Sequence, residues 1–189
     1  MSGTDIYEVP GGLPEPEDDG ACDHLPGMRL PSVSLAATSG EHIDLSTLAG
    51  TTIVYCYPLT GRPDRDLPQG WDEIPGARGC TPQSCAFRDH HAELQDLGAR
   101  VFGLSTQDGD YQREAAERLN LPYELLSDEE LEFARALGLP TFEAEGMTLL
   151  KRVTLVLEGG EIRKVFYPVF PPGRNAKVVI GWLSAHHAS

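Results

Sequence analysis

The chain has 189 residues, of which 40% are hydrophobic and 23% are charged, values typical of a globular domain. Its 29 acidic residues against 15 basic ones give a formal net charge of −14, which argues against nucleic-acid binding because that function needs basic patches. No stretch approaches the roughly 18 consecutive apolar residues of a membrane span. The N-terminus lacks the positive flank and apolar region of a secretory signal, so we expect a cytoplasmic protein.

Two segments differ from the rest in composition. Residues 1–24 hold seven acidic residues and no basic one, with three prolines and four glycines. We expect an acidic tail, either draped loosely over the folded domain of residues 25–189 or used to bind a partner. Residues 61–78 (GRPDRDLPQGWDEIPGAR) contain three prolines and three glycines. This composition predicts a long loop of the kind that often forms a lid or a binding site.

Between these segments the hydrophobic pattern alternates between strands and helices. Thr51–Tyr57 (TTIVYCY) is a β-branched and aromatic run, as expected for a strand buried on both faces. Thr81 as N-cap and Pro82 at the first helical position predict a helix that ends at Gly98. Further along the chain we predict a strand over 99–105, a helix over 110–120, a strand over 121–126, and a helix that begins with a Ser127–Glu130 capping box and ends at Gly138. Two strands over 151–157 and 161–167 are joined at Gly159-Gly160, and a last helix after Asn175 buries Val178, Val179, Trp182 and Leu183. Upstream of all these elements, residues 33–35 and 42–45 are predicted to form a small hairpin.

Strands separated by helices imply a parallel sheet with right-handed crossovers, and the closing hairpin adds an antiparallel edge. The order therefore predicts an α/β, thioredoxin-like fold with a central, mostly parallel sheet and flanking helices. Such a fold does not by itself assign a chemistry.

Cys80 lies where the first long strand leads into the first long helix, in the sequence GCTPQSC. Free backbone N–H groups and the positive end of the helix dipole stabilise an anion at this position, and a thiolate is such an anion. Gly79 permits close approach of the backbone to whatever reacts with the sulfur. The position therefore predicts a reactive cysteine.

Cys85 follows Cys80 by five residues. On an intact helix their Cα atoms would be roughly 8.6 Å apart, whereas a disulfide needs about 4.4–6.8 Å. The two sulfurs can join only after the first turns of the helix unwind. The spacing favours a redox pair with local unfolding over a structural disulfide.

The other cysteines and the nearby histidines have simpler interpretations. Cys56 lies inside a predicted buried strand and is expected to be a core thiol. Cys22, in the acidic tail, is expected to be an exposed bystander, with a resolving role as the alternative. His90 and His91 could join Cys80 and Cys85 in a zinc cluster, but cysteines five apart on a helix point about 140° apart, so tetrahedral closure fails. We therefore expect no metal.

The sequence GCTPQSCAFRD followed by HHAEL resembles the active-site helix of the Q-type peroxiredoxins, also called bacterioferritin comigratory proteins. The resemblance extends from about Leu25 to Leu183 and includes LPGMRLPSVSL, DLSTLAG, VFGLSTQ, ELLSDEE, KRVTLVL and GGEIRKVF. It implies a peroxidatic cysteine at Cys80, a resolving cysteine at Cys85 and an arginine facing the peroxidatic sulfur at Arg152.

The same resemblance implies further features of the site. Pro58 would shield the pocket, and the amide groups around Gly79 would favour charge on the leaving oxygen. The substrate would be a hydroperoxide and the reductant thioredoxin or a similar dithiol, with no metal or organic cofactor. The protein would be a monomer or a homodimer.

One departure from the family pattern concerns peroxide alignment. The family motif has a proline seven residues before the peroxidatic cysteine and a threonine three residues before it. Here Ala77 stands three residues before Cys80, and Pro58 lies 22 residues upstream. Residues 61–78 therefore look like an insertion, and the missing hydroxyl either comes from Thr60 or is absent.

Two other classes of function stay open at this stage. A thiol–disulfide oxidoreductase would share the fold, and Leu139-Pro140-Thr141 resembles its cis-proline loop. However, that class uses C-x-x-C, and the apolar run after Pro140 starts only at Val153. A non-catalytic redox sensor or binding module would use the acidic tail and the 61–78 segment as contact surfaces.

Overall fold

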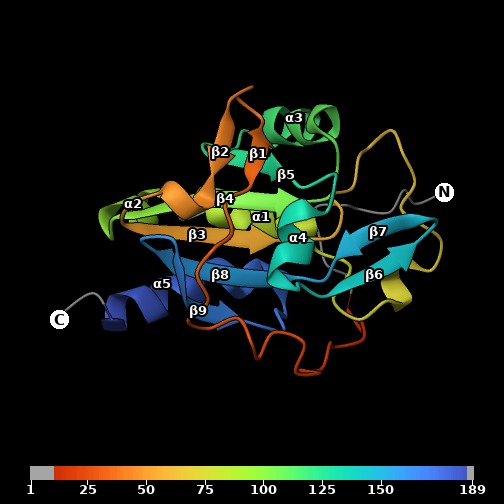
Figure 1. The fold of residues 1–189 in the computed structure, drawn as a ribbon. Coiled ribbons are helices and arrows are strands. Elements are labelled where there is room, and N and C mark those ends of the chain that lie inside the picture. The colour runs from red at the N-terminus through yellow and green to blue at the C-terminus, as the bar shows by residue number, and fades with distance from the viewer. Residues whose placement is uncertain (1–10, 187–189) are drawn as a thin grey trace.

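A computed structural model describes residues 11–186 of the chain, which form a seven-stranded sheet in the order β2-β1-β5-β4-β3-β8-β9 (Figure 1). At its centre β5, β4 and β3 run parallel, and the pairings on both sides are antiparallel. The strands are β1 (Ser34–Ala37), β2 (His42–Asp44), β3 (Thr51–Cys56), β4 (Ala99–Ser105), β5 (Glu124–Ser127), β8 (Val153–Glu158) and β9 (Glu161–Phe166).

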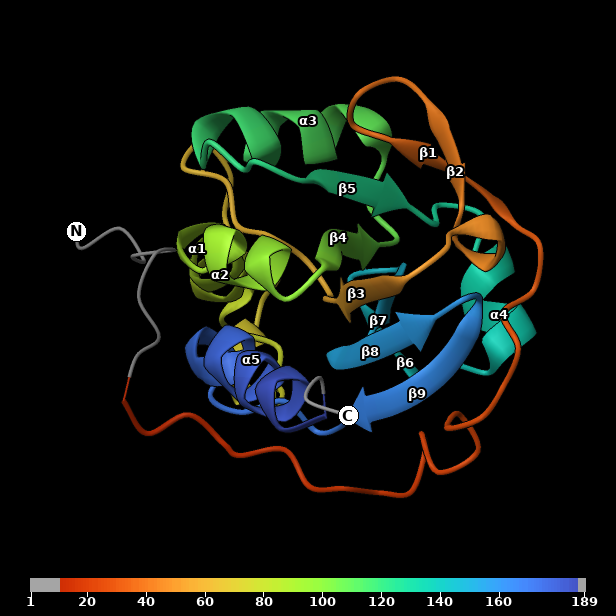
Figure 2. The same ribbon diagram turned by 90° about the vertical axis from the view of Figure 1, so that its left-hand side faces the viewer.

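Helices cover both faces of this sheet. Figure 2 shows α1, α2 and α5 on one side and α4 on the other. The helices are α1 (Cys80–Asp89), α2 (His91–Asp96), α3 (Gly109–Arg118), α4 (Glu132–Leu137) and α5 (Asn175–His186). The predicted α/β fold, with a parallel centre and a closing Gly159-Gly160 hairpin, is confirmed. None of the helices within residues 11–186 has the length and apolar character to cross a membrane.

The central strand β3 separates two hydrophobic cores. Ile53 and Tyr55 face the core that contains Cys80 and the apolar sides of α1, α2, α3 and α5. Val54 and Cys56 face the second core, which contains α4 and β1. All four side chains are buried, which explains why this strand has a near-continuous apolar sequence rather than an alternating one.

The part of the acidic tail that the structure describes, residues 11–24, runs along the outside of the molecule and then enters the α4 core (Figure 2). The Asp19 carboxylate accepts a hydrogen bond from the Tyr167 hydroxyl at 2.8 Å and lies 3.3 Å from the Lys151 ammonium. Cys22 and Leu25 are buried in the α4 core. Cys22 is thus a buried residue, and the expectation that it is exposed is wrong.

The predicted helix from Thr81 to Gly98 is two helices with a break at His90. The N-cap is Gly79 rather than Thr81, and Cys80 is the first helical residue. The end is as predicted, because Gly98 adopts a positive φ of 76° that glycine tolerates.

Three further details of the elements differ from prediction. The helix α4 is capped by Asp128, whose carboxylate accepts from the backbone N–H groups of Phe133 and Ala134, rather than by a Ser127–Glu130 box. The strand predicted over 121–126 is displaced to β5 at Glu124–Ser127. On α5, Val178 is 52% exposed instead of buried.

A separate antiparallel hairpin, β6 (Thr141–Ala144) with β7 (Met147–Leu150), lies beside the 61–78 loop (Figure 1). The loop contains a 3-10 turn, Trp71–Glu73, and its Trp71 packs with Leu149 and Phe142 of the hairpin. Two segments about 70 residues apart therefore share a small hydrophobic core. The sequence did not predict this hairpin, because Glu143, Glu145 and Gly146 interrupt its apolar pattern.

Candidate active site

The thiol of Cys80 lies at the N-terminus of α1, which follows β3 and the 61–78 loop in the chain. Gly79 adopts a φ of 116°, which a residue with a side chain rarely tolerates, and it serves as N-cap without any side-chain hydrogen bond. The backbone N–H groups of the first turn, where Cys80 is the first helical residue, therefore have no side-chain cap. Cys80 is only 2% exposed.

Arg152 reaches this thiol because of the pairing between β3 and β8. Cys56 pairs with Val153, so Arg152 lies level with Tyr57 at the end of β3 where α1 begins. Its Nη2 donates to Cys80 Sγ at 3.2 Å and to the Ala77 carbonyl at 3.0 Å. The guanidinium is 4% exposed, so its charge acts on the sulfur with little screening by water.

A chain of hydrogen bonds fixes the orientation of Arg152. Its Nη1 donates to Gln83 Oε1 at 2.5 Å, Gln83 Nε2 donates to Asn175 Oδ1 at 3.1 Å, and the Thr154 hydroxyl donates to the same oxygen at 2.7 Å. Sequence reasoning missed Gln83 and Asn175. Gln83 stands three residues after Cys80, a spacing that places both on the same side of a helix, and this signal could have identified it.

Cys85 lies on the same intact helix and is half-buried. Burial raises the pKa of its thiol. The residues around it hold α1 in its helical form: Tyr123 donates its hydroxyl to the Ser84 carbonyl at 2.8 Å, and Tyr55 stacks on Phe87 with ring centroids 4.7 Å apart.

Pro58 is buried directly after β3, and Thr60 is buried close by. The Thr60 hydroxyl donates to Gln107 Oε1 at 3.3 Å, and the Thr60 carbonyl accepts from the Tyr111 hydroxyl at 2.9 Å. The hydroxyl and the carbonyl of Thr60 therefore both have hydrogen-bond partners, Gln107 and Tyr111. Thr81 instead lines a small cavity together with Cys80, and its buried hydroxyl has no hydrogen-bond partner among the described residues.

The remaining two cysteines lie on the other face of the sheet from Cys80. Cys22 and Cys56 both belong to the α4 core. Burial raises the pKa of Cys22 to about 12 and raises that of Cys56 still further. The predicted core position of Cys56 is confirmed, and the sheet separates Cys22 from the reactive thiol.

Within residues 11–186, no cluster of three or more His, Cys, Asp or Glu side chains is arranged to hold a metal ion. His90 Nδ1 instead lies 2.8 Å from the Glu93 carboxylate, and the ring of His91 packs beside that of Tyr123. The two histidines thus pack against Glu93 and Tyr123.

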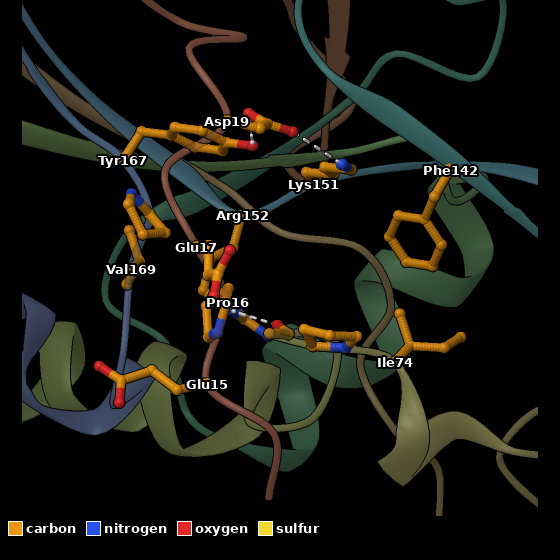
Figure 3. Close-up of a pocket in the computed structure, with 13 residues that line it drawn as sticks. Glu15, Pro16, Glu17, Asp19, Ile74, Phe142, Lys151, Arg152, Tyr167 and Val169 are labelled. Carbon is orange, nitrogen blue, oxygen red and sulfur yellow. Dashed lines mark hydrogen bonds and ion pairs between the residues drawn. The ribbon is translucent and has the colours of Figure 1, made fainter.

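Arg152 also lines a larger cavity of about 560 Å³. Figure 3 shows Asp19, Tyr167 and Lys151 at one end and Phe142 and Ile74 along one wall. Cys80 does not line this cavity.

Comparisons with known proteins agree with this geometry. The redoxin family matches residues 25–180. Over 161 residues the chain is 32% identical to the chloroplastic peroxiredoxin Q of Gentiana triflora, covering 84% of this chain and 66% of that protein. The chain belongs to the Q-type peroxiredoxins.

Two bacterial relatives extend the comparison. The peroxiredoxin Bcp of Escherichia coli is 29% identical over 165 residues, which are 85% of this chain and 96% of that protein. The crystal structure of peroxidoxin BcpB from Mycobacterium tuberculosis superposes with a TM-score of 0.70 at 25% identity, covering 86% of this chain and 98% of that one. The predicted thioredoxin-like fold and the resemblance to Q-type peroxiredoxins are both confirmed, while the chain spans only about two thirds of the length of the plant relatives.

Proposed function

We propose that this peroxiredoxin is a thiol-dependent peroxidase that reduces hydroperoxides with Cys80 as the attacking thiol. The observation that carries the proposal is the 3.2 Å contact between the Arg152 guanidinium and Cys80 Sγ at the start of a helix. A buried cation and free N–H groups together stabilise a thiolate, which is the nucleophilic form of cysteine.

In the first step the Cys80 thiolate attacks one oxygen of the hydroperoxide and the O–O bond breaks. The sulfur is oxidised to a sulfenic acid, and the second oxygen leaves with the bonding electron pair and takes up a proton as water or an alcohol. Arg152 stabilises the negative charge that moves to the leaving oxygen, and the N–H groups beside Gly79 contribute in the same way. No metal or organic cofactor takes part.

In the second step the thiol of Cys85 condenses with the sulfenic acid, which forms a Cys80–Cys85 disulfide and releases water. The first turns of α1 must unwind for this, because on the intact helix the Cα atoms are too far apart. A dithiol donor such as thioredoxin then reduces the disulfide by exchange and is itself oxidised.

The hydroxyl that aligns the peroxide is assigned to Thr81 in this proposal. Thr60 donates its hydroxyl to Gln107, whereas Thr81 lines the cavity at Cys80 and its buried hydroxyl lacks a partner within residues 11–186. A buried hydroxyl without a partner costs free energy that a bound peroxide would recover by hydrogen bonding.

The two alternative functions have less support. In a thiol–disulfide oxidoreductase the segment 139–141 would adjoin the reactive cysteine, but Thr141 begins β6 in the separate hairpin. A non-catalytic sensor would not need an arginine on the sulfur. We keep a cytoplasmic location as a prediction only, since the plant relatives are named as chloroplastic.

The test uses purified full-length protein, thioredoxin, its reductase and NADPH. We expect peroxide-dependent turnover that Cys80→Ser abolishes and that Arg152→Ala lowers by about 10²-fold or more, the usual cost of losing a donor to a developing anion. Arg163→Ala, which removes an exposed arginine paired with Glu158, is the matched control. Single-turnover peroxide consumption that persists in Cys80→Ser would refute the assignment.

A further inference from the structure

The cavity that the Cys80 thiol lines is small. Its volume is about 10 Å³, and its lining consists of Gly61, Leu67, Arg78, Gly79, Cys80 and Thr81. A cavity needs about 10–15 Å³ to hold one water molecule. The space is close to one water molecule in size, so hydrogen peroxide requires less widening of it than an alkyl hydroperoxide does.

The 61–78 loop forms part of the wall of this cavity, and several contacts hold the loop in place. The Gly61 carbonyl accepts from Arg118 Nη2 at 2.8 Å, and the backbone N–H of Gln69 donates to the Glu145 carboxylate at 3.0 Å. Arg78, 5% exposed, pairs with Asp72 at 2.9 Å. Together with the shared core around Trp71, these contacts make the loop a fixed wall at both of its ends.

The larger cavity offers no second route to the thiol. Arg152 and Gly76 lie in its wall, and Cys80 does not line it (Figure 3). The Arg152 Nε donates to the Gly76 carbonyl at 3.3 Å, while its Nη2 lies on the sulfur. An alkyl chain in the larger cavity would therefore have to displace Arg152 to bring its peroxide group to Cys80.

We propose that Leu67 is a specificity-determining residue, which narrows the cavity at Cys80 and makes hydrogen peroxide the preferred substrate over bulky alkyl hydroperoxides. This inference rests on the proposed peroxidase function. Leu67 is the one large apolar side chain in the lining of this cavity, and it is partly exposed. Truncating it widens the cavity, while the hydrogen bonds at Gly61 and Gln69 stay in place.

The experiment measures single-turnover oxidation of Cys80 by hydrogen peroxide and by cumene hydroperoxide in the full chain, with the sulfenic acid trapped and quantified by mass spectrometry. In the wild type we expect a much larger rate constant for hydrogen peroxide. Leu67→Ala should raise the cumene rate relative to the hydrogen peroxide rate by about tenfold or more, because pocket volume of a methylene or more is worth about 10–200-fold in selectivity. Leu67→Val should give a smaller change in the same direction and provides the test if Leu67→Ala folds poorly.

Leu149→Ala is the matched control, since it removes the same atoms from the shared core without lining the cavity. We expect its ratio of rates to stay within about twofold of the wild type, below the smallest pocket effect. An equal gain in Leu149→Ala would assign the selectivity to general loosening of the loop and overturn the role of Leu67. Equal rates for both peroxides in the wild type would also overturn it, whereas failure of both peroxides to oxidise Cys80 would refute the proposed function itself.

Discussion

The hydrogen bond from Tyr123 to the Ser84 carbonyl allows a direct test of helix unwinding. Tyr123→Phe removes the hydroxyl and leaves the ring, which is buried against Tyr55. The variant changes no residue of α1, so the intrinsic helix propensity of the segment stays the same. We expect faster formation of the Cys80–Cys85 disulfide and an unchanged rate of peroxide attack.

The size of the effect follows from the one bond to α1 that the variant loses. The 2.8 Å bond from Tyr123 to Ser84 exists only while α1 is helical, whereas the 2.8 Å contact between the Tyr123 and Tyr55 hydroxyls does not involve α1. A neutral hydrogen bond contributes about 0.5–1.5 kcal/mol net. The unwound population, and with it the rate of disulfide formation, should therefore rise about 2- to 13-fold, by the relation of about 1.36 kcal/mol per factor of ten.

The assay mixes reduced protein with one equivalent of peroxide, quenches at intervals and separates sulfenic acid from disulfide by mass spectrometry. Tyr167→Phe is the control, because that hydroxyl bonds Asp19 and not α1. An unchanged disulfide rate in Tyr123→Phe would mean that unwinding does not limit this step. An equal acceleration in Tyr167→Phe would show that the effect is unspecific.

Three further outcomes are expected. Cys85→Ser should react once with peroxide and then stall as a sulfenic acid, or proceed to sulfinic acid under excess peroxide. Peptide mass mapping would detect both products. A Cys80–Cys22 disulfide in this variant would contradict the separation of Cys80 from Cys22 by the sheet. Cys22 and Cys56 should resist alkylation at neutral pH in the folded protein and react after unfolding, since burial raises both of their pKa values. The Tyr167 hydroxyl, a backbone N–H and the Lys151 ammonium lower the pKa of Asp19 to about 2. The contact between the tail and the domain is therefore complete above the ordinary pKa of 3.8 and is lost as the pH falls through about 2. Pepsin should cut the wild-type tail only near that lower pH, whereas it should cut the tail of Asp19→Asn at about pH 4.

Prediction of the fold from sequence succeeded where a single strong local pattern dominates. The strand Ala99–Ser105 and the Gly159-Gly160 turn have the predicted positions, because a mostly apolar run and a glycine pair leave few alternatives. The N-cap of α1 was wrong because a glycine at positive φ competes with a threonine for that role, and only the surrounding structure decides between them. The cap of α4 was wrong for a similar reason, since Asp128 reaches two backbone N–H groups from one residue further along.

The residues of the candidate site were also predictable only where a local sequence pattern marks them. Cys80 and Cys85 follow from local spacing, and the resemblance placed Arg152 correctly beside the sulfur. Asn175 contacts Gln83 across 92 positions of sequence, and no local pattern encodes such a contact. The position of Leu67 beside Cys80 was equally unpredictable, because it depends on the unpredicted hairpin that supports the loop.

The shared core of the 61–78 loop and the β6–β7 hairpin also places an optical probe at the site. The chain has two tryptophans. Trp71 is 3% exposed beside Phe142, in the shared core against which the cavity residue Leu67 packs, whereas Trp182 stacks on His186 at the C-terminal end of α5. With Trp182→Phe in place, the tryptophan fluorescence of the protein would come from Trp71 alone. Its emission wavelength would then report changes in the packing of the shared core during turnover without any attached dye.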